Sequence, residues 1–358
     1  KQNVNVMPSQ LDDEQTALMR RAVYAETQKM NQGRRAPVDA YAELKNGKVS
    51  TVAAKKGNQY DVQDLIKQFN SQRANGTIRL TTHYTQPLAA DSKTVQAEKA
   101  KLQTLSKRKV TYTVEKENYK FTAADVITRA TYQHGKYNFD TSAVNGRIAK
   151  INEKQATLGK AFKFRTHAGK EITTSDKGSY GWKISEQLAG QSLAHAMADN
   201  KKNVNAKSDI YGIGYNRRGT GYGVTSNNGI GNTYVELSLA DQHVWFYKDG
   251  KCVFDASVVT GKHSSGDDTP KGVWYIMYKQ RNTTLRGTSD NGSAYASPVS
   301  YWAPFTDSGC GFHDASWRTN WSSTAYLNDG SNGCVNMHTS DAGTAYDSLT
   351  QYEPVIVY

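Results

Sequence analysis

One cysteine near the C-terminus stands among residues that could carry out acyl transfer. Cys334 lies in the run Ser331-Asn-Gly-Cys-Val-Asn336, and His313 precedes this run. A thiol attacks as the thiolate, and a free cysteine with a pKa of about 8.5 is only slightly ionised at neutral pH. An imidazole is the usual neighbouring base. The two residues therefore predict a cysteine nucleophile that His313 activates.

The residues around Cys334 suit the other needs of such a reaction. Gly333 allows the backbone to approach a substrate carbonyl closely, and the N–H groups of Gly333 and Cys334 could bind an oxyanion. Ser331 or another polar group could orient the base through its second ring nitrogen. However, a cysteine that follows a glycine is more often a small buried hydrophobe, and the residues alone leave that interpretation open.

The other thiols and a nearby histidine have simpler interpretations. The chain has three cysteines, too few for a disulfide scaffold. Cys252 lies in a strand pattern and is expected in the core. Cys310 is expected to pack, and a disulfide between Cys310 and Cys334 would abolish activity. A zinc site formed by Cys310, His313, Cys334 and His338 does not match the usual ligand spacings.

The residues around Cys334 and His313 that must hold these side chains in place have the alternating pattern of β-strands. The strands are predicted at residues 234–239, 243–247, 252–259 and 272–277, with a hairpin turn at Asp249-Gly250. Residues 231–358 are therefore expected to form a mainly β domain, either a sandwich or a barrel. Residues 281–297 are rich in Gly, Asn, Ser and Thr, so they form either a lid over the site or an ordinary surface loop. Trp302, Trp317 and Trp321 surround His313 in the sequence and are expected to pack in the core, although one of them could contact substrate.

The first 230 residues contain landmarks of a diverged duplication. Gly47 and Gly169, Tyr60 and Trp182, and Val62 and Ile184 are each 122 positions apart. They predict two α+β modules at residues 1–108 and 109–226, with a linker over 216–232 and a solvated helix over 91–108.

Local signals predict elements inside these modules. Val62, Leu65, Ile66 and Phe69 have helical spacing, and the apolar residues from Ile184 to Met197 repeat this pattern loosely. Residues 110–114 alternate as a half-buried strand does, and Thr122 is expected to cap a helix. The whole chain is thus expected to be multidomain, with two α+β modules before a mainly β domain that has mixed sheets.

Charge is distributed unevenly along the chain. Residues 231–358 contain 8 Lys and Arg against 13 Asp and Glu, a net charge of −5, whereas residues 1–230 contain 37 against 20, a net charge of +17. A basic segment suits a polyanion such as nucleic acid, anionic lipid or wall teichoic acid, although a solvated lysine-rich surface has the same composition. No run of eighteen apolar residues occurs, so no membrane span is predicted, and any leader or anchor is expected upstream.

The order of these motifs resembles the L,D-transpeptidase (YkuD-type) catalytic domain. The similarity rests on His313 followed by Ser331-Asn-Gly-Cys-Val-Asn336, and on Thr269-Pro-Lys-Gly272, which is similar to the family's Thr-Pro-x-Gly element. Residues 259–262 resemble the turn before that element, and residues 234–246 resemble the opening strand pair. The two N-terminal modules resemble the peptidoglycan-binding modules that often precede this domain in Gram-positive bacteria.

This resemblance implies an extracellular acyltransferase of peptidoglycan synthesis and cell wall biogenesis that needs no metal or cofactor. Cys334 would attack the carbonyl of stem-peptide residue 3 and release D-Ala, and an amine of a neighbouring stem would take the thioester in a 3→3 cross-link. His313 would be the base. Gly333, Asn332 and Asn336 would bind the oxyanion or the substrate, and carbapenems would acylate Cys334.

The implied partners are the donor and acceptor stem peptides of the cell wall. Anionic wall polymers would bind the basic N-terminal modules, nucleic acid would not be a partner, and a membrane anchor would lie upstream. The enzyme would act at the outer face of the cytoplasmic membrane of a Gram-positive bacterium.

One departure from the family keeps other functions open. The family has a histidine immediately before Gly-Cys, where this chain has Asn332. The alternatives are an L,D-carboxypeptidase, or a wall- or polyanion-binding protein with an inactive catalytic domain. Papain-like wall endopeptidases place Cys before His, and sortases require an arginine after the cysteine, whereas no arginine follows Arg318.

Overall fold

The computed structural model describes residues 2–4, 13–73, 78–288 and 292–358. The chain divides into two compact units. The first unit comprises Lys1–Thr111, Lys120–Val144 and Leu193–Lys202, and the second comprises Tyr112–Tyr119, Asn145–Ser192 and Asn203–Tyr358. Within the described part of the chain, none of the helices has both the length and the apolar character of a membrane span. The division into modules at 1–108, 109–226 and 231–358 stays a prediction.

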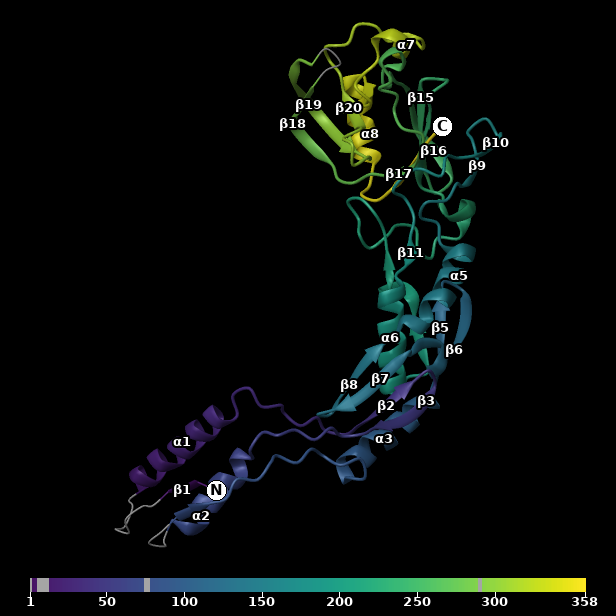
Figure 1. Ribbon diagram of the computed structural model, residues 1–358. Helices are drawn as coiled ribbons and strands as arrows, with labels where there is room; N and C mark the ends of the chain where they lie inside the picture. The colour runs from purple at the N-terminus through teal and green to yellow at the C-terminus, as the bar shows by residue number, and fades with distance from the viewer. Residues whose placement is uncertain (1, 5–12, 74–77, 289–291) are drawn as a thin grey trace. The chain divides into compact units, whose positions relative to one another are not determined.

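The first unit is built around a sheet in the order β3-β2-β7-β8 (Figure 1). Its elements are β1 (Gln2–Val4), α1 (Asp13–Met30), β2 (Tyr41–Lys45), β3 (Lys48–Val52), α2 (Val62–Gln72), β4 (Ile78–Leu80), α3 (Lys93–Ser106), α4 (Ala123–Val126), β7 (Arg129–Gln133), β8 (Lys136–Asp140) and the 3-10 helix η1 (Ser142–Val144). The helix predicted from Val62 to Phe69 is confirmed as α2, and Thr122 caps α4 with Asp125 in a capping box, as predicted. Thr77, at the start of the strand pattern that becomes β4, lies outside the described residues.

Helix α3 differs from its prediction as a fully solvated helix. Val95, Leu102 and Leu105 are buried, and the helix contacts β2, β3 and β7. These three residues are spaced by seven and three positions, so they lie on one helical face, which the many Lys and Gln residues of the helix obscure in the sequence. The sheet therefore obtains its apolar cover from a helix that looks polar on average.

Three elements contribute residues to both units, and the predicted strand at 110–114 is confirmed among them. These elements are β5 (Lys109–Val114), β6 (Glu117–Thr122) and α6 (Glu186–Ala198). The second unit begins with α5 (Asn145–Gln155), β9 (Lys163–Arg165), β10 (Glu171–Thr173), β11 (Lys183–Ile184), β12 (Asn203–Asn205), η2 (Ala206–Ser208), β13 (Ile210–Tyr211) and η3 (Ser226–Gly229). The loose apolar spacing from Ile184 to Met197 corresponds to α6.

Two asparagines make the same contact in the two N-terminal regions. The side chain of Asn31 pairs with both backbone groups of Tyr60, at 2.7 and 3.0 Å, two positions before α2 begins. Asn152 pairs in the same way with Ile184, at 2.8 and 2.9 Å, two positions before α6 begins. This parallel supports the proposed duplication, but it aligns Tyr60 with Ile184, which is two positions later than the 122-residue offset implies.

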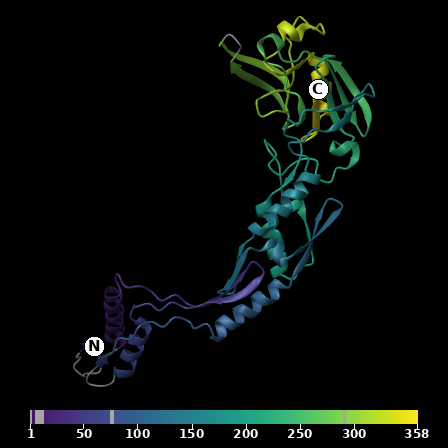
Figure 2. The same cartoon turned by 45° about the vertical axis from the view of Figure 1, so that its right-hand side comes forward.

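The remaining elements form two sheets with a helix between them. They are β14 (Tyr234–Ser238), β15 (His243–Lys248), β16 (Lys251–Ser257), η4 (His263–Ser265), β17 (Gly272–Tyr275), β18 (Gln280–Thr288), β19 (Ala294–Pro304), β20 (Gly311–Asp314), α7 (Ala325–Asp329), β21 (Val335–Met337), α8 (Thr339–Ser348) and β22 (Pro354–Val357). One sheet has the order β16-β15-β14-β22-β17 and the other β18-β19-β20-β21. Helix α8 lies between the sheets in both views (Figures 1 and 2), and Ala342, Ala345 and Leu349 share one apolar core with strands of both.

Both sheets are mixed, as the sequence predicts for this mainly β region. β22 pairs parallel to β14 and antiparallel to β17, and β20 pairs parallel to β21. The hairpin predicted at Asp249-Gly250 is confirmed, with φ of 49° and 80° at the two turn residues. Residues 281–297, expected to be a loop, instead contain the hairpin strands β18 and β19, and residues 289–291 within that range lie outside the described part.

The outer face of the β14 sheet is covered by the segment that contains β9 and β10. Phe162, Phe164 and Tyr180 pack there with Tyr234 and Ile356 in a second apolar core. Residues 216–232, predicted as a linker, are packed against the rest of the second unit at their C-terminal end. Ile230 belongs to this same core, and the hydroxyl of Tyr180 donates to the carbonyl of Gly229 at 2.9 Å. Apolar contacts of this kind are non-local, so the Gly- and Asn-rich composition did not reveal them.

Candidate active site

Two neighbouring parallel strands bring the predicted base and nucleophile together. β20 carries His313, and β21 begins directly after Cys334. In the register of this pair, His313 lies opposite Asn336. A pairing between strands separated by twenty residues therefore decides which side chains meet, and both predicted catalytic residues line the same pocket.

The loop that carries Cys334 is fixed by the segments resembling the family's upstream elements. The N–H of Ser331 donates to the carbonyl of Thr260 at 3.0 Å, and the N–H of Lys262 donates to the carbonyl of Ser331 at 2.8 Å. The hydroxyl of the buried Thr269 donates to the carbonyl of Gly333 at 2.7 Å. The Thr-Pro-x-Gly element thus holds the nucleophile loop by a direct hydrogen bond.

Gly333 is required by two features of this loop. Its φ of +107° is a conformation that L side chains rarely adopt, and a Cβ atom there would lie 2.8 Å from the Sγ of Cys310. Cys310 is buried in the core between the sheets, as predicted. Cys252, predicted in the core, is exposed instead. It lies on the edge strand β16, next to a register shift at Phe246 and Tyr247.

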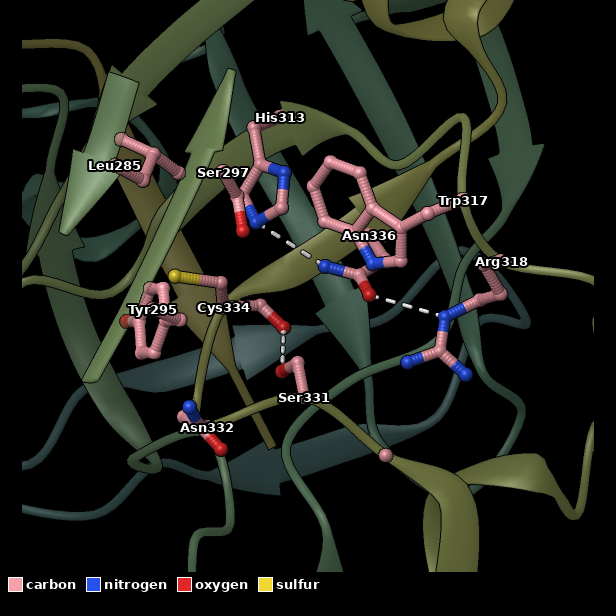
Figure 3. Close-up of a pocket in the computed structure, with 11 residues that line it drawn as sticks. Leu285, Tyr295, Ser297, His313, Trp317, Arg318, Ser331, Asn332, Cys334 and Asn336 are labelled. Atoms are coloured by element: carbon pink, nitrogen blue, oxygen red, sulfur yellow. Dashed lines mark hydrogen bonds between the residues drawn. The ribbon is translucent and has the colours of Figure 1, made fainter. Parts of the chain in front are cut away.

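The pocket is an open cavity of about 250 Å³. Its lining residues are Leu285, Tyr295, Ser297, His313, Trp317, Arg318, Gly330, Ser331, Asn332, Cys334 and Asn336. Leu285, Tyr295 and Ser297 come from the β18–β19 hairpin, which stands over the sulfur of Cys334 (Figure 3). The region considered as a lid therefore forms one wall of the site.

His313 is held at both ring nitrogens. Its Nδ1 is 2.8 Å from the backbone carbonyl of Asp314, and its Nε2 is 3.1 Å from the side-chain nitrogen of Asn336. Burial lowers the pKa of His313, and the nearby Arg318 lowers it further, while the Asp314 carbonyl acts in the opposite direction. The ring is therefore a neutral base at neutral pH.

The hydroxyl of Ser331 does not contact this ring. It donates to the carbonyl of Cys334 and accepts from the N–H of Gly333 at 3.2 Å, so it shapes the nucleophile loop. The group at the second nitrogen of His313 is the Asp314 carbonyl, which side-chain motifs do not show because every residue has one. The predicted orienting role is thus filled by backbone.

Cys334 rests as a neutral thiol. Burial, with a smaller contribution from the neighbouring Cys310, raises the pKa of its thiol to about 12, and a hydrogen bond from the backbone of Gly311 partly offsets the rise. The sulfur donates weakly to the carbonyl of Gly309 at 3.5 Å. In Figure 3 it points towards Tyr295, away from the line that joins His313 to Asn336. Thiol and imidazole are therefore close neighbours that do not share a proton in this state.

The predicted oxyanion and substrate-binding residues differ in their accessibility. Asn332 is exposed at the pocket, where it can meet a substrate. Asn336 is buried, with its amide between His313 and Arg318. The N–H of Gly333 is directed to Ser331, so the backbone of Cys334 is the better-placed oxyanion donor of the predicted pair. These binding roles stay predictions.

The site also contains residues that the sequence did not single out. Arg318 lines the pocket and bonds Asn336, and its only signal was its position five residues after His313. Trp317, predicted in the core, is half-exposed and stacks near His313, with ring centres 5.9 Å apart. The ring of His338 stacks on Trp321 at 3.8 Å. Within the described residues, no group of three or more His, Cys, Asp and Glu side chains is placed to bind a metal ion.

A cysteine and a histidine in one pocket are the parts of a cysteine enzyme that forms an acyl thioester, either a transferase or a hydrolase. The family model of the L,D-transpeptidase catalytic domain (YkuD) matches residues 232–357. The Enterococcus faecium L,D-transpeptidase, solved as a cysteine-to-serine variant, is 28% identical, with a TM-score of 0.54 over 72% of this chain and 98% of that one. The Ldtfm–avibactam carbamoyl enzyme is also 28% identical, with the same TM-score, over 72% of this chain and 96% of that one.

The catalytic domain of the E. faecium enzyme, solved by NMR, is 38% identical over 35% of this chain and 96% of that one, with a TM-score of 0.32. The comparison with curated proteins gives no match. Residues 232–357 are an L,D-transpeptidase catalytic domain, and over 72% of its length the chain is similar to L,D-transpeptidases. It is therefore an acyltransferase.

Proposed function

We propose that the chain forms 3→3 cross-links between peptidoglycan stem peptides, with Cys334 as nucleophile and His313 as base. The observation that carries this proposal is the shared pocket of the two side chains, which adjacent parallel strands present from a fixed register. The L,D-transpeptidase catalytic domain indicates the substrate class, namely stem peptides of the cell wall. Such a substrate places the enzyme at the outer face of the cytoplasmic membrane, in the cell wall.

The first half of the reaction acylates the cysteine. The thiol leaves the carbonyl of Gly309 and gives its proton to Nε2 of His313, which at that moment gives up its hydrogen bond from the Asn336 amide, while sulfur bonds to the carbonyl carbon of stem residue 3. The N–H of Cys334 stabilises the oxyanion that forms. The intermediate collapses by breaking the bond to D-Ala, whose nitrogen takes the proton from His313. A thioester remains on Cys334.

The second half transfers the acyl group. An amine of a neighbouring stem attacks the thioester carbonyl and loses a proton to His313. The bond to sulfur then breaks, and the sulfur recovers the proton as a thiol. Water in place of the amine would give an L,D-carboxypeptidase, so the identity of the acceptor decides between the two products.

The basic residues 1–230 are proposed to bind anionic polymers of the cell wall. The charge of residues 1–230, a net +17, supports binding to anionic wall polymers. The same charge would serve an inactive wall-binding protein. The pocket next to an intact Cys334 and His313 favours an active enzyme.

Intact-mass spectrometry with a carbapenem tests the nucleophile. The wild-type chain should gain one adduct, Cys334→Ala should gain none, and His313→Gln should react more slowly. Cys252→Ala is the matched control, because it removes an exposed thiol outside the pocket and should leave labelling intact. A wild-type chain that stays unmodified, or a Cys334→Ala variant that still reacts, would overturn the proposal.

Incubation with a stem tetrapeptide tests the acceptor. Release of D-Ala together with a cross-linked dimer supports transfer. Release of D-Ala with only the tripeptide product would instead establish the carboxypeptidase.

A further inference from the structure

Arg318 is a buried cation within the catalytic pocket. Among the described residues that line this pocket, it alone carries a permanent charge. Its side chain is only 7% exposed, and its backbone N–H donates to the carbonyl of Ala315 in the turn after β20. A guanidinium loses much hydration on burial, so its contacts should reveal what it does.

Its contacts reach the catalytic histidine through one residue. The Nε of Arg318 donates to Oδ1 of Asn336 at 3.0 Å, and one terminal nitrogen donates to the carbonyl of Asp329. The Asp329 carboxylate lies 3.6 Å from the same nitrogen, but it is mostly exposed and contributes little. Figure 3 shows the line from Arg318 through Asn336 to His313.

The direction of each hydrogen bond in this line is fixed by chemistry. Arginine has only donors, so the oxygen of the Asn336 amide must face Arg318 and the NH₂ must face His313. Nε2 of His313 must then accept, which means that it carries no proton. At the other side of the ring, the carbonyl of Asp314 can only accept, so Nδ1 carries the proton. Two independent partners select the same neutral tautomer.

We propose that Arg318 is a positioning residue which, by fixing the amide of Asn336, holds His313 as the neutral Nδ1–H tautomer, whose unprotonated Nε2 takes the thiol proton when the amide of Asn336 gives up its hydrogen bond. This inference rests on the proposed function only for its consequence on rate. Loss of Arg318 frees the amide to rotate, so that the Asn336 oxygen can turn to Nε2 and compete with the Asp314 carbonyl for the ring proton.

The charges around His313 agree with this role. An imidazolium would place a proton on Nε2 against the NH₂ of Asn336, close to the positive charge of Arg318. The carboxylate of Asp314 favours the imidazolium, but it accepts the N–H groups of Ser300 and Tyr301 at 2.8 and 2.9 Å. The thiol of Cys334, whose pKa is raised by burial, adds no negative charge beside the ring at neutral pH.

Nitrogen-15 NMR of the full chain, labelled at histidine, reads the tautomer without any turnover. The signals of His313 are those missing from His313→Gln. The wild type should show a protonated Nδ1 and an unprotonated Nε2 near neutral pH. Arg318→Met should show a mixture of tautomers, with the pKa of His313 higher than in the wild type as the cation and the ordered amide are lost.

Asn336→Asp keeps Arg318 but changes the group that faces Nε2 of His313. A carboxylate keeps an acceptor for Arg318 but also presents an acceptor to Nε2, so His313 should hold a proton there. Arg281→Met is the matched control, because Arg281 pairs with Asp347 at 2.7 Å, is half-exposed and does not line the pocket. It should leave the spectrum of His313 unchanged.

Carbapenem acylation followed against pH provides the second readout. Arg318→Met should react about 10-fold more slowly at neutral pH, the size of one hydrogen bond, with its acid limb moved upwards. Arg318→Lys should recover part of the rate, because one ammonium donor can still reach Asn336. Thermal melts confirm that each variant is folded.

One result would overturn the positioning role of Arg318, and a different result would overturn the proposed function. An Arg318→Met variant that keeps the Nδ1–H tautomer and the wild-type pKa of His313 would reduce Arg318 to a structural support. A wild-type chain that is not acylated, but whose tautomer responds to Arg318→Met, would overturn the proposed function and leave the positioning contact intact.

Discussion

Two histidines of the second unit are both bonded at Nδ1, yet their surroundings give them opposite uses. His313 meets a backbone carbonyl, an amide and, beyond it, a guanidinium. His167 meets the fully buried carboxylate of Glu236 at 2.9 Å, and its ring stacks on Trp245 with centres 3.6 Å apart. The unprotonated Nε2 of His313 lies next to the pocket, whereas the Glu236 carboxylate and the stacked ring of Trp245 hold His167 as a contact between segments.

The two histidines also lie in different kinds of surroundings. His313 lines a solvent-filled pocket beside Cys334. His167 lies between β9 and β10, and its backbone N–H also donates to Glu236, so it fastens that hairpin to β14. The comparison teaches that the neighbouring pocket and thiol, and not the partner at Nδ1, distinguish His313 from His167, because a carboxylate at Nδ1 also occurs in catalytic triads.

Replacement of the two histidines should give the largest contrast. His313→Gln should slow acylation of Cys334 by about 10²- to 10⁴-fold, because the general base is lost. His167→Gln should keep the wild-type rate per folded molecule. Stopped-flow acylation with a carbapenem measures both, and equal losses in the two variants would break the comparison.

Removal of the carboxylate should affect stability and not chemistry. Glu236→Ala leaves the N–H and Nδ1 of His167 and the hydroxyl of Tyr358 without their acceptor, at a cost of about 3 kcal/mol in the free energy of unfolding. Urea unfolding followed by tryptophan fluorescence measures this loss. A large drop in the acylation rate of the folded variant would mean that the hairpin acts on the site.

The pH dependence of acylation sharpens the contrast further. Because burial lowers the pKa of His313 from its usual value of 6.5, the rate should persist as the pH falls through 6.5 and decline only below it. The unfolded chain takes up this proton first, so His313 also makes the fold less stable as the pH falls below 6.5. A rate that already halves above pH 6.5 would contradict a lowered pKa.

The smallest expected effect is at the C-terminal residue. Tyr358→Phe removes a hydroxyl that donates to Glu236 at 2.6 Å, and it should cost about 1 kcal/mol in unfolding free energy, with no change in acylation. His167 still donates to the carboxylate, so the loss is smaller than for Glu236→Ala. Destabilisation as large as that of Glu236→Ala would assign the contact to Tyr358 rather than to His167.

The sequence by itself determined the features that depend on neighbouring residues. The spacing from Val62 to Phe69, the cap at Thr122 and the turn at Asp249-Gly250 act within a few positions, so they predicted α2, α4 and a hairpin correctly. The motif residues His313 and Cys334 also identified the two side chains that share the pocket, because chemistry restricts which residue types can serve.

Only the tertiary structure decided which groups contact His313 and His167 and which side chains are buried. The carbonyl of Asp314 has no side-chain signature, Arg318 reaches Asn336 across eighteen positions, and Glu236 meets His167 across sixty-nine. Cys252 is exposed and the polar-looking α3 is half-buried for the same reason. Strand order and packing between distant segments set burial and partners, and local sequence patterns carry no record of them.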